Sequence, residues 1–163
     1  MELTIIAAVS ENNVIGIDGK VPWHIKEDTA RFKRLTLDHP VMMGRATYES
    51  IPLRFRPLAQ RKNIILSSVL EPAKGIYVAR SIGEAVRFAE DKDSYVIGGE
   101  SIYRQFMHLA TRMELTRVHR DFQGDAFFPE FNPKDWNLDG EIKEVSEPGE
   151  GSINYSFITY SRR

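Results

Sequence analysis

The stretch SYVIGGESIYRQFMHLA, residues 94–110, contains the unit from which the fold is built. Its opening residues, SYVIGG, predict a short β-rich strand that ends in a pair of glycines. The residues that follow, ESIYRQFMHLA, carry apolar side chains at helical spacing and predict an amphipathic helix. A strand that runs directly into a helix indicates a strand–helix–strand unit, and repeats of that unit form a parallel sheet.

The same alternation recurs along the chain. Further β-rich runs are LTIIAAV (3–9), VMM (41–43), KNIILSS (62–68), GIYVA (75–79) and MELTRVH (113–119). Helical patterns lie between several of them, at EDTARFKRLT (27–36), ATYESI (46–51) and SIGEAVRFAE (81–90). The sequence therefore predicts an α/β fold whose mostly parallel, twisted sheet is covered by helices on both faces.

Turn-rich segments complete this outline. From Trp136 to Tyr160 the pattern predicts two strands around SEPGEGS (146–152), hence an antiparallel hairpin at one edge of the sheet. The connection SENNVIGIDGKVPW (10–23) is long and glycine-bearing, so it is a candidate mobile lid. A second loop, PLRFRPLAQR (52–61), carries three arginines.

The composition is that of a single globular domain spanning residues 1–163, since 42% of the residues are hydrophobic and 28% are charged. The longest apolar runs, such as IIAAV near the start, are far too short to cross a membrane. The first residues also lack the basic region of a secretion signal. The chain has no cysteine, which excludes thiolate metal sites and fits the reducing cytoplasm.

Charge is unevenly distributed, although the net charge is only −1. Residues 20–62 are basic and residues 121–151 are acidic. One interpretation is a pair of solvated faces, and the other is that the basic segment meets a small anionic ligand. Nucleic acid is the weaker hypothesis because the arginines are not interleaved with aromatic residues.

Candidate anion sites lie where strands give way to helices. Arg45 and Thr47 open the helix of GRATYES, and Gly98 and Gly99 precede the helix of VIGGES, where a ligand could approach the main chain. Neither motif is a GxGxxG or a P-loop, so each one alone is better explained by a tight turn, and it is their occurrence together in one sheet that favours an anion site. Ser67 and nearby residues end another strand, at the sheet edge where α/β folds bind ligands.

The acids and histidines offer few candidates for chemistry. The four histidines, at positions 24, 39, 108 and 119, match no metal-binding spacing, so no metal site is expected. Glu27, Glu49 and Asp125 are possible acids, but Asp28 lies beside a half-buried helical stripe. Asp28 is either a functional carboxylate or a first-turn acid stabilised by the helix dipole.

Taken together, several motifs resemble the dihydrofolate reductase family of bacterial type. The resemblance rests on VIGIDGKVPW (14–23), the segment 28–36, VMMGRATYESI (41–51), RKNIILSS (61–68), VIGGESIY (96–103), ELT (114–116) and GDAFFPEF (124–131). It implies the reduction of dihydrofolate to tetrahydrofolate with NADPH, a reaction of one-carbon metabolism and an antifolate target. Dihydrofolate would be the small-molecule partner.

The resemblance also assigns substrate contacts. Asp28, supported by Thr116, would bind the pterin, and Trp23 would hold an ordered water nearby. Arg61 would pair with the glutamate carboxylate of the folate, although Arg54 and Arg56 lengthen the loop and leave the choice among the three arginines open. The remaining substrate and ring contacts would be Ile6, Ala8, Phe32, Ile51, Leu58, Ile97 and Tyr103.

On the cofactor side, the resemblance implies a cis peptide between Gly98 and Gly99. Arg45, Ser68 and Arg80 would hold the 2′-phosphate of NADPH. Val21 and Trp23 would belong to the mobile loop that closes on the nicotinamide. The other matching cofactor positions are Ala8, Ile15, Gly16, Gly44, Ala46, Thr47, Ser67, Gly99, Glu100, Ser101, Ile102 and Tyr103.

Two alternative functions remain. One is a reductase of a pyrimidine sugar phosphate on the riboflavin pathway, which should lack the buried acid that Asp28 provides here. The other is a non-catalytic folate or nucleotide binding module on the same fold. For the reductase we expect a monomer, since one core accounts for the apolar residues, and we expect it to bind neither nucleic acid nor membrane.

Overall fold

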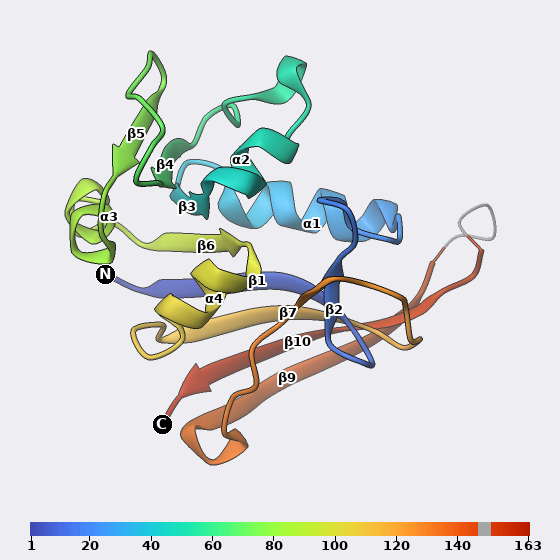
Figure 1. Ribbon diagram of the computed structural model, residues 1–163. Helices are drawn as coiled ribbons and strands as arrows, with labels where there is room; N and C mark the ends of the chain where they lie inside the picture. The colour runs from blue at the N-terminus through green and yellow to red at the C-terminus, as the bar shows by residue number, and fades with distance from the viewer. Residues whose placement is uncertain (147–150) are drawn as a thin grey trace.

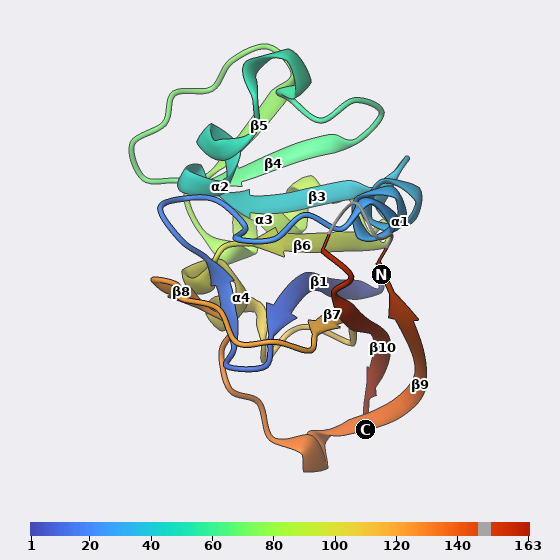
Figure 2. The same cartoon turned by 90° about the vertical axis from the view of Figure 1, so that its right-hand side faces the viewer.

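An eight-stranded sheet in the order β5-β4-β3-β6-β1-β7-β10-β9 organises the computed structural model, which describes residues 1–146 and 151–163 (Figures 1 and 2). The strands are β1 (Leu3–Ser10), β3 (Pro40–Gly44), β4 (Lys62–Leu66), β5 (Ile76–Ala79), β6 (Ser94–Gly98), β7 (Arg112–Val118), β9 (Trp136–Val145) and β10 (Asn154–Arg162). Every β-rich run of the sequence therefore forms a strand.

Most neighbours in the sheet run parallel, as predicted. From β5 to β7 every pairing is parallel, and only β10 runs antiparallel to its neighbours β7 and β9. The C-terminal hairpin is thus confirmed, with β9 as the edge strand. The central part of its predicted turn, residues 147–150, lies outside the described residues.

The four predicted helices are present and flank the sheet (Figure 1). They are α1 (Lys26–Thr36), α2 (Arg45–Ser50), α3 (Ile82–Phe88) and α4 (Glu100–Phe106). Ser81 caps α3, because its Oγ accepts a hydrogen bond from the Glu84 amide at 3.1 Å. In contrast, α4 is shorter than its amphipathic pattern, which continues to residue 110. Beyond Phe106 the chain turns, and Leu109 and Ala110 both donate to the Phe106 carbonyl.

Side chains alternate between the two faces of the sheet, as the period of a strand requires. Met42 of β3 lies in a buried cluster with Ala85 of α3 and Phe106 of α4. The next residue, Met43, belongs to a second cluster, which includes Tyr48 of α2. Helices therefore cover both faces, and the carboxyl ends of the parallel strands remain open between them.

Part of the predicted mobile lid forms regular secondary structure. Within residues 10–23, β2 (Val14–Gly16) pairs antiparallel with β8 (Ala126–Phe127), and the two strands lie side by side in Figure 2. The second predicted loop contains a 3₁₀ turn, η1 (Leu53–Phe55), and another, η2 (Pro133–Asp135), precedes β9. Neither β2 nor β8 is long enough to give a strand pattern by itself. Among the described residues, no helix combines the length and apolar character needed to span a membrane.

Candidate active site

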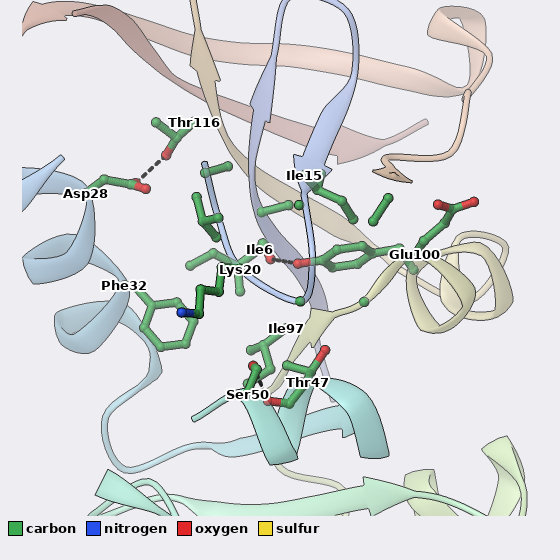
Figure 3. A pocket seen from close by; sticks show the side chains of 18 of the residues that line it. Ile6, Ile15, Lys20, Asp28, Phe32, Thr47, Ser50, Ile97, Glu100 and Thr116 are labelled. Atoms are coloured by element: carbon green, nitrogen blue, oxygen red, sulfur yellow. Dashed lines mark hydrogen bonds between the residues drawn. The ribbon is translucent and has the colours of Figure 1, made fainter. Parts of the chain in front are cut away.

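A cavity of about 450 Å³ opens at the carboxyl ends of the central strands (Figure 3). Its walls come from β1, β6 and β7, from α1, α2 and α4, and from the β2 loop and its neighbour β8. The carboxyl edge of a parallel sheet is where α/β folds bind their ligands. This cavity, which contains the half-buried acid Asp28, therefore lies where the fold predicts a ligand site.

Asp28 projects from the first turn of α1 into this cavity (Figure 3). Thr116 on β7 donates a hydrogen bond from Oγ1 to Asp28 Oδ1 at 2.6 Å. Burial raises the pKa of Asp28, while the hydrogen bond from Thr116 and the charge of Arg31 act in the opposite direction. Asp28 is therefore a cavity acid held from the facing strand, which goes beyond the role of a first-turn acid at a helix dipole.

Apolar groups and one buried phenol form the floor beside this acid. Ile6 and Ala8 of β1 and Ile97 of β6 line the cavity. Tyr103 of α4 also lines it and donates a hydrogen bond from its hydroxyl to the Ile6 carbonyl at 2.7 Å. Burial, and then the charge of Asp28, raise the pKa of Tyr103, so this phenol stays neutral at physiological pH.

Six of the predicted substrate residues meet at the cavity, and three do not. The lining members are Ile6, Ala8, Asp28, Phe32, Ile97 and Thr116. Ile51 and Leu58 instead pack against the buried cluster that contains Val41 and Met43. Arg61 lies outside the lining as well, where it donates to the Thr36 hydroxyl at 3.1 Å and to the Ala59 carbonyl at 2.9 Å.

The three arginines of the second loop have different surroundings. Arg56 donates to the carbonyls of Ile51 and Glu49, so it holds the end of α2. Arg54 lies over the ring of its exposed neighbour Phe55, 4.8 Å from the ring centroid. Arg61 is half-buried, and its burial lowers its pKa from the ordinary value.

The predicted mobile loop contributes to the cavity unevenly. Ile15, Gly16 and Val21 line it. Trp23 does not line it; its side chain is buried against Phe122, with the ring centroids 5.0 Å apart. Trp23 therefore anchors the C-terminal end of the loop to the protein.

On the other side of the cavity, β3 and β6 end close together. The Gly98–Gly99 peptide is cis, as expected. A Cβ on Gly98 would lie 3.2 Å from the ring of Tyr103, and one on Gly44 would lie 3.0 Å from Ile102 Cγ1. Glycine at these positions lets the strand ends and α4 pack closely. The predicted cofactor residues that line the cavity are Ala8, Ile15, Gly16, Ala46, Thr47, Gly99, Glu100 and Tyr103.

The remaining predicted cofactor residues lie outside the cavity lining. Gly44, Gly98 and Ile102 are packed behind it, and Ser101 is exposed on α4. Arg45 is exposed and forms an ion pair with Glu49 at 2.7 Å. Arg80 donates to the Ser67 carbonyl at 2.9 Å, and Ser68 is exposed beside them. These last residues form a polar surface at the ends of β4 and β5.

Several lining residues were not predicted, among them Lys20, Arg31 and Ser50. Lys20 extends into the cavity from the β2 loop (Figure 3), and no sequence pattern indicates where a loop side chain points. Arg31 could have been found, since it lies three residues after Asp28 and therefore on the same side of α1.

Comparison with known proteins gives relatives over nearly the whole chain. Residues 2–162 match the family model described as dihydrofolate reductase. The dihydrofolate reductases of Neisseria meningitidis serogroup A and Haemophilus influenzae are 40% and 36% identical; the matches cover 99% and 98% of this chain and 99% of each relative. A solved dihydrofolate reductase from Enterococcus faecalis, complexed with NADP(H) and RAB-propyl, is 30% identical with a TM-score of 0.90, covering 99% of this chain and 96% of that one.

Proposed function

The chain belongs to the dihydrofolate reductase family, and on that premise we propose that it reduces 7,8-dihydrofolate to 5,6,7,8-tetrahydrofolate with NADPH. In that reaction NADPH would supply the hydride to the pterin, and the adjacent ring nitrogen would gain a proton. The product then enters one-carbon metabolism. The observation that carries the proposal is the half-buried Asp28 carboxyl, which Thr116 holds in the cavity at the carboxyl ends of the central strands.

Asp28 acts on the pterin. Its carboxylate accepts hydrogen bonds from the 2-amino group and the ring N–H, a paired contact that fixes the ring for attack. Thr116 holds Asp28 Oδ1, so the acid has a fixed orientation before the substrate arrives. Burial raises the pKa of Asp28, so its protonated form persists to higher pH than that of an ordinary aspartate. If the reaction draws on this protonated form, turnover should fall as pH rises through that pKa.

The apolar lining suits the rest of the substrate. Phe32 presents a flat aromatic face to a pterin ring, and Ile6 and Ile97 present apolar side chains. Ile51 and Leu58 lie at the same side of the sheet as the α2 cluster and would meet the benzoyl part of the folate at the cavity rim. Arg61 would bind the glutamate carboxylate.

The cofactor fits where β3 and β6 end. When bound, NADPH supplies the hydride. A Cβ on Gly99 would lie 3.4 Å from Thr47 Oγ1, so the glycine keeps open the passage between α2 and β6. Thr47, Ala46 and Glu100 would hold the cofactor there, with Ile15 and Gly16 covering the nicotinamide end. Arg45, Ser68 and Arg80 would bind the 2′-phosphate.

The first experiment is the loss of NADPH absorbance when the purified protein is mixed with dihydrofolate, with a no-substrate control. Rapid folate-dependent oxidation is the expected result. Oxidation with the riboflavin-pathway pyrimidine sugar phosphate instead would favour the first alternative. Tight NADPH binding without any turnover would favour a binding module.

NADPH should be preferred to NADH by about 10- to 100-fold in kcat/KM, because charge-assisted hydrogen bonds to one phosphate are worth roughly 1.5–3 kcal/mol. Steady-state rates with both cofactors measure this preference. Arg45→Met should reduce it, whereas the same change at Arg34, exposed on α1, should not. Equal use of NADPH and NADH by the unmodified enzyme would remove Arg45 and Ser68 from phosphate binding.

Gly124→Ala should slow turnover by about 10- to 100-fold, because small displacements of residues that cover a reacting site are costly. A Cβ at Gly124 would lie 2.3 Å from Val14 Cγ1 and 2.7 Å from the Gly16 carbonyl oxygen, so β2 must shift. Gly140→Ala is the matched control, since nothing lies within 4 Å of a Cβ there. Measurements of kcat and urea unfolding should show lost activity in a folded protein; unchanged kcat would separate β2 from the reaction.

We further propose that residues 1–163 form one domain that works as a monomer in the cytoplasm, without nucleic acid or a membrane. The continuous sheet and the match of the family model to residues 2–162 support a single domain. The proposed NADPH-dependent biosynthetic reaction supports a cytoplasmic location. Sedimentation of the purified protein tests the oligomeric state.

A further inference from the structure

A second polar contact joins α1 to β7 beside the contact between Asp28 and Thr116. Arg31 Nη2 lies 2.6 Å from Glu114 Oε2. The Glu114 side chain is buried, with 5% exposed, and the Arg31 side chain is mostly covered, with 13% exposed. An ion pair this deeply buried is costly to assemble, so its place next to the cavity acid needs a reason.

The two contacts are parallel bridges between the same two elements. Asp28 and Arg31 are one helical turn apart on α1, and Glu114 and Thr116 are two residues apart on one face of β7. The helix and strand are therefore tied at two successive positions. One tie ends on the acid that binds the pterin.

Further side chains contact both members of the Arg31–Glu114 pair. Glu114 Oε1 accepts from Arg112 at 2.9 Å, and Oε2 also accepts from the Thr159 hydroxyl at 2.9 Å. The Arg31 guanidinium lies over the ring of Phe157, 4.4 Å from its centroid. Arg31 also lines the cavity together with Asp28. Its charge therefore has a fixed place next to the acid.

We propose that Arg31 and Glu114 are positioning residues for Asp28, which fix the first turns of α1 on β7 and set the charge that the acid experiences. The proposal rests on the proposed function, because it deepens the role of Asp28 in that reaction. Through its effect on Asp28, the Arg31–Glu114 ion pair would set the pH range in which the reductase works.

The expected effects have opposite signs. The Arg31 cation opposes the burial that raises the pKa of Asp28, and the Glu114 anion offsets part of that cation. Removing Arg31 should therefore raise the pKa of Asp28, and neutralising Glu114 should lower it. Among the other titratable or charged groups around Asp28, Lys20, Glu100 and Tyr103 line the cavity. Those on α1 and β7 are Lys26, Glu27, Lys33, Arg34, Arg112 and Arg117, and apart from Arg34 in the control every variant retains all of these groups.

The experiment compares Arg31→Met, Arg31→Lys and Glu114→Gln with the control Arg34→Met, an exposed arginine on the same helix. Turnover is measured from pH 5 to 9, and ¹³C-labelled aspartate follows the Asp28 carboxyl directly in the cofactor-free protein. The Asp28 signal is the one lost in Asp28→Asn. Urea unfolding establishes that each variant is folded.

Arg31→Met should move the falling limb of the pH profile, and the Asp28 titration, to higher pH. One pH unit above the wild-type midpoint, it should retain about two- to fivefold more of its plateau turnover than wild type does. Glu114→Gln should move both curves to lower pH, and Arg31→Lys should stay close to wild type because it keeps the charge. Arg34→Met should change neither curve.

Unchanged curves in both Arg31→Met and Glu114→Gln, or shifts in the same direction, would overturn the proposal and leave the pair as a stability element. The carboxyl titration does not require turnover. A wild-type protein that fails to reduce dihydrofolate would therefore defeat the proposed function, while the titration still decides whether the pair sets the charge at Asp28.

Discussion

Asp28→Asn should lower dihydrofolate turnover at neutral pH by about two to three orders of magnitude, the usual cost of removing one aligned electrostatic group from an active site. An amide offers one acceptor and no charge, so it cannot form the paired contact with the pterin. Stopped-flow measurement of NADPH oxidation separates the chemical step from product release. Near-normal hydride transfer would remove Asp28 from the mechanism.

The same variant makes a stability prediction with a definite sign. Burial raises the pKa of Asp28 above its ordinary value of 3.8, so the folded protein binds this proton more tightly than the unfolded chain. The stabilisation is complete below that ordinary value and is lost as pH rises through the folded value. Asp28→Asn should therefore gain resistance to urea relative to wild type as pH rises. Glu27→Gln, at the neighbouring acid outside the cavity lining, should keep its turnover.

The sheet could be predicted because each parallel strand carries its own local pattern. In the segment 94–110, strand and helix are adjacent in sequence, and both form as β6 and α4. The end of α4 was not predictable, since the apolar spacing continues to residue 110 although the helix stops at Phe106. There the Phe106 carbonyl accepts hydrogen bonds from the backbone amides of the following turn. Whether the chain turns or continues as a helix at this point depends on tertiary packing.

Local sequence patterns could not predict which short, distant segments pair with each other. The partners β2 and β8 are more than 100 residues apart and two or three residues long, so neither carries a readable period. The Arg31–Glu114 ion pair could not be predicted for the same reason, since the sequence does not indicate which strand residue faces a given helix position. The place of Asp28 at the cavity could be expected because it lies beside a half-buried stripe of its helix, and the family motifs then indicated its neighbours.

The sequence leaves open which of three loop arginines would bind the glutamate carboxylate of the folate, and their surroundings in the structure differ. Arg56 uses its guanidinium on the carbonyls of Ile51 and Glu49, and Arg54 lies over exposed Phe55. Arg61 makes its described hydrogen bonds from Nε and Nη1, so among the described residues its Nη2 has no acceptor. The bond to the buried Thr36 at the end of α1 also fixes its direction. We therefore propose Arg61 as the arginine that binds the glutamate carboxylate.

Arg61→Leu should weaken dihydrofolate binding by about 2–5 kcal/mol, or roughly 30- to several thousandfold in Kd, because the bound glutamate carboxylate loses its charged partner. Burial lowers the pKa of Arg61, but an arginine remains charged at neutral pH, so the pair exists under working conditions. Fluorescence titration of the protein with dihydrofolate measures the change, and Arg54→Leu serves as the matched control in the same loop. A folate analogue without the glutamate should bind both variants equally well. Unchanged dihydrofolate affinity in Arg61→Leu, with a loss in Arg54→Leu, would move the tail contact to Arg54 and the rim of η1.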